Sequence, residues 1–147
     1  MKIHFLGTNG WYDTTPTGNT ICTLLETKDA YIVFDLGFGV QKLDKYIKDD
    51  RPIYIFISHF HLDHVCGFHV LPKFKFKQGI NIIYQDNRVN RAALKSLSNP
   101  PLCATFDFYG YPVKLLPIKS GGYSKPLKFE CLPLKHTAPC LGYRLYV

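Results

Sequence analysis

The apolar run Pro52–Ser58, PIYIFIS, is followed without a linker by HFHLDH, residues 59–64. Its β-branched and aromatic side chains predict a buried strand. In a chain of this composition and length, the pattern H-x-H-x-D-H arises by chance only about once in 10³ sequences. The chain must therefore fold so that four metal-capable side chains emerge together from the end of one buried strand.

Changes in hydrophobic period divide the rest of the chain into strands and helices. Strands are predicted at 2–7, 20–27, 30–37, 53–58, 80–85, 105–110, 113–118, 127–136 and 142–147. Helices are predicted at 40–49, from Asp63 to an end by Pro72, and at about 87–97, where SNPP ends the last one. Strands interleaved with helices and followed by consecutive strands predict a layered α/β or α+β architecture, and the length predicts a single domain, 1–147.

Composition predicts the setting of this domain. The 147 residues are 46% hydrophobic, yet no apolar stretch reaches the roughly 18 residues of a membrane span, and the N-terminus is unlike a secretory signal. The five cysteines are never spaced C-x-x-C, so no disulfides are expected. A metal role for Cys66 or Cys140 is an alternative to simple packing. We expect a soluble, cytoplasmic protein.

The formal net charge of +7 makes a polyanion such as RNA a plausible partner. The segment PKFKFKQG, residues 72–79, alternates lysines with phenylalanines. This alternation fits a basic strip with stacking aromatic rings, but it is more typical of a solvated lysine face above buried rings.

The motif at 59–64 has the chemistry of a metal site. Side chains two positions apart in an extended segment point the same way, so His59 and His61 can bind one ion together. His64 follows Asp63 where a helix begins, which directs this second pair elsewhere and implies a second ion. Zinc suits imidazole and carboxylate ligands, and manganese or iron would also accept them. Asp63, near a helix N-terminus, should be ionised and could also accept a proton.

The other histidines need separate interpretations. His136, in LPLKHTAPCLGYR, lies at a predicted strand end and is a candidate third ligand. His4 lies inside the first predicted strand, and His69 lies one turn beyond the cluster. A lone histidine is more often a hydrogen-bonded imidazole, and we expect that of both.

Several motifs together resemble the metallo-β-lactamase superfamily of hydrolases. HFHLDH resembles its H-x-H-x-D-H signature, FLGTNG with PTGNT resembles its N-terminal strand and glycine turn, and IVFDLGFGVQKL resembles its D-x-G-x-G segment. HTAPCLGYRL resembles the H-x-x-P-x-x-G-Y-R segment of the ribonuclease Z branch, the tRNA 3′-end processing endonucleases. These matches follow the family order from residue 3 to residue 146.

The resemblance implies a four-layer αβ/βα sandwich with the metals at one edge of two packed sheets. It implies that His59, His61 and His136 hold the first metal and that Asp63 and His64 supply part of a second site. It also implies that Asp35 positions the metal-binding loops without binding metal. Arg144 could meet a phosphate, or it could be an ordinary surface arginine.

One departure from the family pattern matters as much as these matches. The family's metal-bridging aspartate and its last histidine ligand lie beyond the G-Y-R segment, and the sequence has no later Asp or His after it. We therefore expect the N-terminal half to two-thirds of the fold, with a wide apolar face covered by the rest of a longer chain, by another copy or by another chain. We expect the 147 residues to bind at most one ion well and to have negligible turnover.

For the complete enzyme, the resemblance implies a metal-dependent phosphodiesterase or endoribonuclease of the ribonuclease Z type, in which one or two zinc ions activate a water and Asp63 orients it. A tRNA precursor or other RNA would be the substrate, and a homodimer is expected. Two alternatives remain open. The first is a superfamily hydrolase of a small ester, lactone or cyclic phosphodiester, and the second is a noncatalytic metal-binding module.

Overall fold

A computed structural model describes residues 1–12 and 18–147. The strands are β1 (Lys2–Gly7), β2 (Cys22–Glu26), β3 (Tyr31–Phe34), β4 (Ile53–Phe56), β5 (Ile80–Gln85), β6 (Val113–Ile118), β7 (Gly121–Tyr123), β8 (Phe129–Pro133) and β9 (Leu141–Leu145). The helical segments are η1 (Phe38–Lys45), α1 (Leu62–Val65), η2 (Cys66–Lys73), α2 (Arg88–Leu97) and η3 (Phe106–Tyr109). In the expected PTGNT turn, Pro16 and Thr17 lie outside the described residues.

The strands form two sheets. The larger sheet has the order β1-β2-β3-β4-β5-β6, and the smaller has the order β7-β8-β9. Strands β1, β2 and β3 pair antiparallel, as predicted for the 20–37 hairpin, whereas β3 through β6 pair in parallel. Because parallel neighbours need a crossover connection, helical segments lie between β3 and β4 and between β4 and β5.

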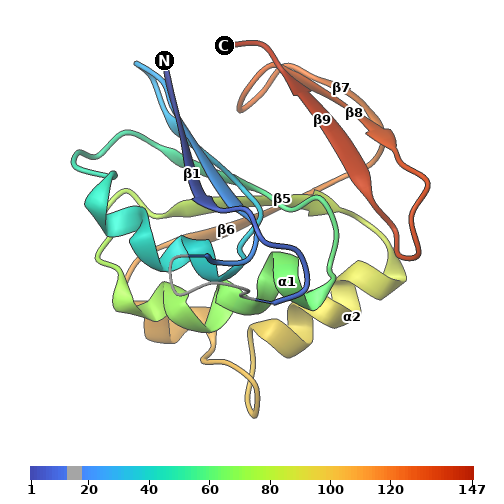
Figure 1. Cartoon of the computed structure of the whole chain (residues 1–147), viewed down its shortest axis with the longest axis horizontal. Helices are drawn as coiled ribbons and strands as arrows, with labels where there is room; N and C mark the ends of the chain where they lie inside the picture. Colours follow the sequence, from blue (N-terminus) through green and yellow to red (C-terminus); the bar gives the residue numbers. More distant parts are fainter. Residues whose placement is uncertain (13–17) are drawn as a thin grey trace.

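The helical segments, the large sheet and the small sheet form three layers (Figure 1). They confirm the α+β architecture and supply three of the four layers expected of the αβ/βα sandwich. All helical segments of the described chain contribute to the core on one face of the large sheet, around buried Val40, Leu43, Phe68 and Leu71. The small sheet packs on the other face, where Phe56 meets Phe129 edge-on at 5.1 Å between ring centroids. No described helix is long and apolar enough to span a bilayer.

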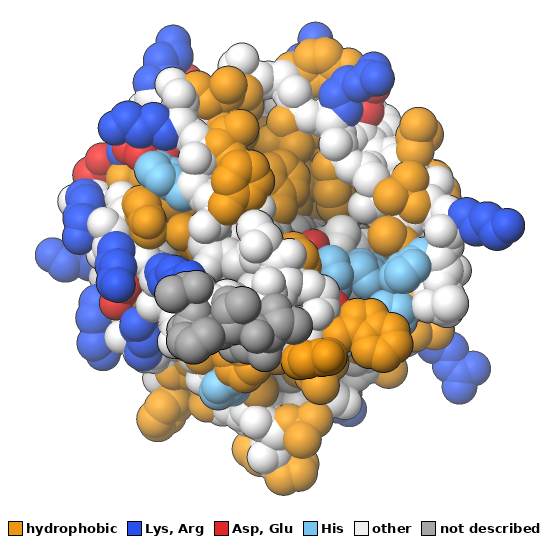
Figure 2. All heavy atoms as spheres, in the orientation of Figure 1, with side chains coloured by type: hydrophobic (Ala, Val, Ile, Leu, Met, Phe, Trp, Pro, Cys, Tyr) orange, Lys and Arg blue, Asp and Glu red, His pale blue; other side chains and the backbone are white. Residues whose placement is uncertain are grey.

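The small sheet covers only part of the face against which it packs. Ile3 and Phe5 of β1 remain 55% and 71% exposed. Figure 2 shows hydrophobic side chains lining the hollow between the β1 hairpin and the small sheet. At its end, Ile32, Leu127 and Tyr146 help to line a cavity of about 400 Å³. A bare apolar face was expected from the sequence, and part of one is present.

The prediction of a strand at 105–110 was wrong, because this segment is the 3-10 helix η3. The alternation of Phe106 and Phe108 suggested period two, but Phe108 is 74% exposed. Phe106 instead contacts Tyr109, three residues on, with 5.4 Å between ring centroids. Spacing of three matches a 3-10 turn, which Gly110 ends in the left-handed conformation.

The two helices flanking the histidine motif are present, but with other bounds and another type. The segment predicted at 40–49 is a 3-10 helix that begins at Phe38 and ends at Lys45. The helix predicted from Asp63 begins at Leu62 as one α-helical turn and continues as 3-10 turns through Lys73, one residue past the predicted end at Pro72. Proline's fixed φ is compatible with a 3-10 turn, and its missing N–H matters little near a helix end.

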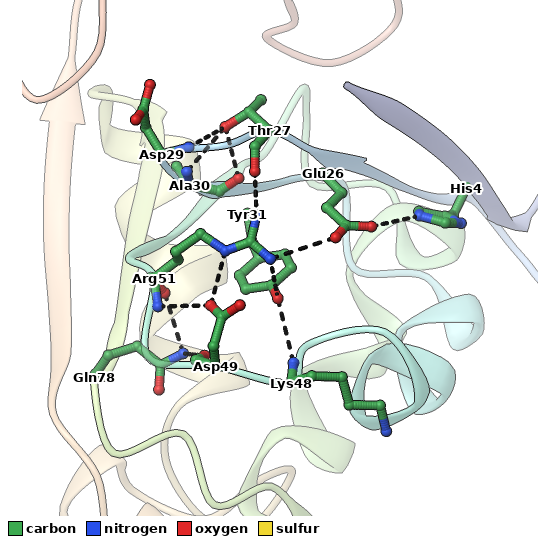
Figure 3. Close-up of polar contacts among 10 residues, drawn as sticks. All are labelled: His4, Glu26, Thr27, Asp29, Ala30, Tyr31, Lys48, Asp49, Arg51 and Gln78. Atoms are coloured by element: carbon green, nitrogen blue, oxygen red, sulfur yellow. Dashed lines mark hydrogen bonds and ion pairs between the residues drawn. The ribbon is translucent and has the colours of Figure 1, made fainter.

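At the end of the sheet opposite the histidines, Arg51 ties the β2–β3 hairpin to the start of β4 (Figure 3). Its guanidinium lies 4.2 Å above the Tyr31 ring and donates to the Tyr31 hydroxyl, to the carbonyl of Thr27 and to Asp49. Glu26 lies between Arg51, at 3.4 Å, and His4, at 3.2 Å. His4 therefore has the hydrogen-bonded structural role expected for it.

Candidate metal centre

The centre begins where the buried strand β4 ends. Past Phe56 the chain stays extended because Ile57 N–H donates to the carbonyl of Ile83 on β5. His59 follows after Ser58 and is only 6% exposed. His61 is the residue that precedes the single turn of α1, and Asp63 and His64 lie inside that turn.

Three imidazoles converge at this strand end. His59 Nε2 lies 3.2 Å from His61 Nδ1, and His136 Nε2 lies 3.1 Å from the same atom. One ligand nitrogen from each ring lies within 4.8 Å of the others, and no other such group of three or more is found in the described part of the chain. A tetrahedral zinc ion, with zinc–nitrogen bonds of about 2.0–2.1 Å, holds its ligands about 3.3–3.4 Å apart. The two separations measured from His61 Nδ1 are therefore close to those of ligands that share one ion.

The large and small sheets each supply part of this group. His136 lies between β8 and β9, and Leu134 N–H donates to the carbonyl of Cys140 to close that loop. Leu141 N–H donates to the carbonyl of Ser58 at 2.9 Å, and the Tyr143 hydroxyl donates to the carbonyl of Ile57 at 2.8 Å. These bonds fix the small sheet directly against the residues that precede His59.

Asp35 lies beneath the histidines with a carboxylate that is almost fully buried. It follows β3 at a positive φ of 58°. The carboxylate accepts hydrogen bonds from Ser58 N–H at 2.7 Å, from the Ser58 hydroxyl at 2.8 Å and from His64 Nδ1 at 2.8 Å. It thus holds two segments that carry candidate ligands.

These bonds also favour one tautomer of His59. Because the Ser58 hydroxyl donates to Asp35, its oxygen is left to accept from His59 Nδ1–H at 2.9 Å. The lone pair of His59 is then on Nε2, toward His61. Burial, followed by the neighbouring His64, lowers the pKa of His59 to about 4, so the ring is neutral at pH 7. A neutral imidazole with a directed lone pair is the form that binds metal.

Asp63 and His64 form a separate pair beside the three imidazoles. His64 Nε2 lies 3.7 Å from Asp63 Oδ2, which also accepts the Trp11 N–H at 2.8 Å. Burial acts to raise the pKa of Asp63, but the Trp11 bond and His64 outweigh it, and the pKa is lowered. Burial acts to lower the pKa of His64, but the bond to Asp35 outweighs it, and the pKa is raised. The pair could supply two ligands of the three or more that a tight metal site needs.

Comparison with known proteins supports what the geometry suggests. The sequence profile of the Metallo-beta-lactamase superfamily matches residues 15–89, just over half of the chain. The chain belongs to the metallo-beta-lactamase superfamily. It is 32% identical over 155 aligned residues to a protein named Ribonuclease Z from Macrococcus caseolyticus and 28% identical over 155 residues to one named Ribonuclease BN from Proteus mirabilis. Each match covers 99% of this chain and 49% of the relative, so the chain spans about half their length.

The crystal structure of the metallo-beta-lactamase fold protein YhfI from Bacillus subtilis has the same fold. It aligns with a TM-score of 0.71 at 16% sequence identity, covering 98% of this chain and 56% of YhfI. Like the ribonuclease relatives, YhfI is longer than the chain, and the aligned part contains both sheets.

The other residues considered in the sequence analysis lie outside the group of three histidines. Arg144 is on β9, 74% exposed, and faces Glu130 across the strand pair at 3.7 Å. His69 is exposed beside Phe38. Burial raises the pKa values of the Cys66 and Cys140 thiols, which keeps both protonated and suits packing rather than metal binding. Cys140 is buried near Leu141.

Sequence reasoning missed Ser58, Thr137 and Trp11. Ser58 connects Asp35 to His59, and its only sequence signal is its place directly before the motif. Thr137 Oγ1 lies 3.5 Å from His61 Nε2, on the side of the ring opposite the shared nitrogen. Trp11 reaches Asp63 from 52 residues away, so no local pattern could reveal it.

Gly37, within the D-x-G-x-G segment, lets its backbone pack tightly against the backbone of Asp63 and of Ile21. A Cβ there would lie 2.5 Å from the carbonyl oxygen of Asp63 and 2.6 Å from backbone atoms of Ile21. We expect Gly37→Ala to lower the free energy of unfolding by about 1–3 kcal/mol, measured by urea denaturation. Gly122→Ala is the matched control, because a Cβ at Gly122 meets nothing within 4 Å. Equal effects of the two substitutions would contradict this account.

Proposed function

We propose that the protein is a metal-dependent phosphodiesterase, an endoribonuclease of the ribonuclease Z type that acts on tRNA precursors or other RNA. The observation that carries this proposal is the convergence of three imidazole nitrogens beside Asp63 and His64. It is supported by relatives named Ribonuclease Z and Ribonuclease BN that align with 99% of the chain. A cytoplasmic location is part of the proposal.

His59, His61 and His136 would hold the principal ion, for which zinc is the leading choice and manganese or iron(II) are alternatives. When bound, the ion supplies a Lewis acid for the phosphoryl group and lowers the pKa of water. The fit rests on the 3.1 and 3.2 Å separations of the nitrogens and on a His59 ring kept neutral with its lone pair at Nε2.

Asp63 performs the proton chemistry in this proposal. Its lowered pKa keeps the carboxylate ionised at neutral pH, and Trp11 N–H holds Oδ2 in place. An ionised carboxylate beside the ion can orient a water and accept its proton. His64, held by Asp35, would offer Nε2 to a second ion together with Asp63. Because Asp63 and His64 alone do not complete a second metal site, we propose that the 147-residue chain binds one ion tightly and has negligible turnover.

The proposal is tested by incubating the natural full-length protein with a precursor tRNA and, separately, with bis(p-nitrophenyl) phosphate. We expect both to be cleaved and Asp63→Asn to reduce both rates by at least about 10²-fold. Cleavage of the small ester alone would favour a hydrolase of small esters, lactones or cyclic phosphodiesters. Tight metal binding with no hydrolysis of either would favour a noncatalytic module. Undiminished hydrolysis by the variant would disprove the site assignment.

Two accompanying expectations remain proposals. Arg144, exposed and paired with Glu130, could release its partner to contact a phosphate. A homodimer would cover the exposed apolar side chains between β1 and the small sheet, which is the arrangement that large exposed apolar patches favour. Sedimentation of the natural protein measures the second expectation directly.

A further inference from the structure

A cavity of about 220 Å³ lies on the side of the metal centre formed by Asp63. The described residues that line it are Trp11, Tyr12, Thr20, Phe38, Leu62, Asp63 and Cys66. Figure 2 shows hydrophobic side chains directly beside the histidine cluster. Of its described lining residues, the proposed metal binding and proton transfer use Asp63 alone.

The lining selects for a neutral, flat group. Trp11 is 87% exposed, Tyr12 66% and Leu62 72%, which are large values for apolar side chains gathered in one place. Among the described lining residues, Asp63 carries the sole formal charge, and it is negative. An anionic phosphate is therefore disfavoured inside. The volume is below the roughly 300–1,000 Å³ of pockets for drug-sized ligands and suits a single ring system.

The cavity and the metal centre share one wall. Asp63 Oδ2 accepts the Trp11 N–H at 2.8 Å and lies 3.7 Å from His64 Nε2. Trp11 has a positive φ of 66°, an uncommon conformation for a bulky residue, and this bond helps to hold it. A group bound in this cavity would thus lie against Asp63, beside a phosphate held at the proposed metal centre.

We propose that this cavity binds the nucleobase next to the scissile phosphodiester, by stacking on Trp11 and Tyr12. This inference rests on the proposed function, because it assigns the neighbouring phosphate to the metal centre. Aromatic side chains stack on any base, so the cavity favours an unpaired nucleotide over a sugar phosphate alone, without strong sequence preference. It distinguishes an RNA substrate from a small ester.

Trp11 is the sole tryptophan of the 147-residue chain, so tryptophan fluorescence reports on this cavity directly. The chain, with and without zinc, is titrated with adenosine 5′-monophosphate and, separately, with ribose 5-phosphate. We expect saturable quenching by the nucleotide and none by the sugar phosphate. Equal quenching by both, or quenching by neither, would overturn the inference.

Tyr12→Ala is the test variant, because it keeps the probe and removes one stacking surface. We expect it to weaken nucleotide binding about fivefold or more. Phe108→Ala is the matched control, since Phe108 is a similarly exposed aromatic residue, at 74%, on η3. Equal weakening by both variants would overturn the inference. If RNA is cleaved but no base-dependent quenching occurs, the cavity assignment fails alone. Base-dependent quenching without cleavage of any phosphodiester removes the proposed function and leaves a base-binding cavity.

Discussion

Replacing His61 with alanine is expected to abolish tight zinc binding by the 147-residue chain. His61 Nδ1 is the atom that both other candidate ligands approach, at 3.2 Å from His59 Nε2 and 3.1 Å from His136 Nε2. Losing it leaves two ligands that are not sufficient for a closed tetrahedral site. Because removing residues that only orient ligands already weakens metal affinity roughly 10–100-fold, we expect a loss of more than about 100-fold here. Competition with a chromophoric chelator measures the affinity.

His69→Ala is the matched control for this experiment. His69 is exposed and lies outside the group of three imidazoles, and its Nδ1 contacts the carbonyl of Cys66. Its loss should leave zinc affinity unchanged. A His61→Ala chain that retains the wild-type zinc affinity would disprove the assignment of the metal centre. Two tightly held zinc ions per wild-type chain would contradict the incomplete second site.

Replacing Asp35 with alanine is expected to have the largest effect on stability. The substitution removes the acceptor of three hydrogen bonds, two from Ser58 and one from His64, at a position that is 5% exposed. Leaving buried donors unpaired, one of them on a histidine with a raised pKa, costs about 3–5 kcal/mol of unfolding free energy. Urea denaturation of the metal-free chain measures this loss. Zinc affinity should also fall about 10–100-fold, because the His59 ring loses its orientation.

Asp35→Gly separates the hydrogen bonds from the backbone conformation. Asp35 has a positive φ of 58°, which glycine adopts freely and alanine does not. If the hydrogen bonds dominate, the glycine and alanine variants should lose nearly the same stability. A glycine variant within about 1 kcal/mol of the wild type would show that strain, not the carboxylate, explains the alanine result.

The sequence allowed the prediction of the large sheet and the convergence of the three imidazoles. Strands β1 to β6 were all anticipated because each has a strong apolar run, and β5 has the predicted bounds, Ile80–Gln85. The grouping of His136 with His59 and His61 followed from the family resemblance, whereas its place at a predicted strand end made His136 no more than a candidate third ligand. The strand β7, Gly121–Tyr123, was missed because GGY carries no alternation, and its pairing with β8 holds it in the sheet.

Other parts of the site depend on contacts that no local pattern contains. Asp35 was foreseen as a positioning residue from the family resemblance, but its contact through Ser58 to His59 exists only once β3 and β4 pair. The bond from Trp11 N–H to Asp63 joins residues 52 positions apart, and Trp11 is otherwise 87% exposed. Hydrophobic periodicity describes what a segment buries, not which distant partner a polar atom meets.

The third imidazole belongs to a different sheet from the first two. His136 precedes β9, whereas His59 and His61 follow β4, and the bond from Leu141 N–H to the carbonyl of Ser58 lies where the two sheets meet. An ion bound at this point would act as a cross-link between layers that otherwise associate through packing and a few hydrogen bonds. Metal binding would therefore hold the three-stranded sheet more firmly against the large sheet. The chain with metal bound should then resist proteolysis better than the metal-free chain.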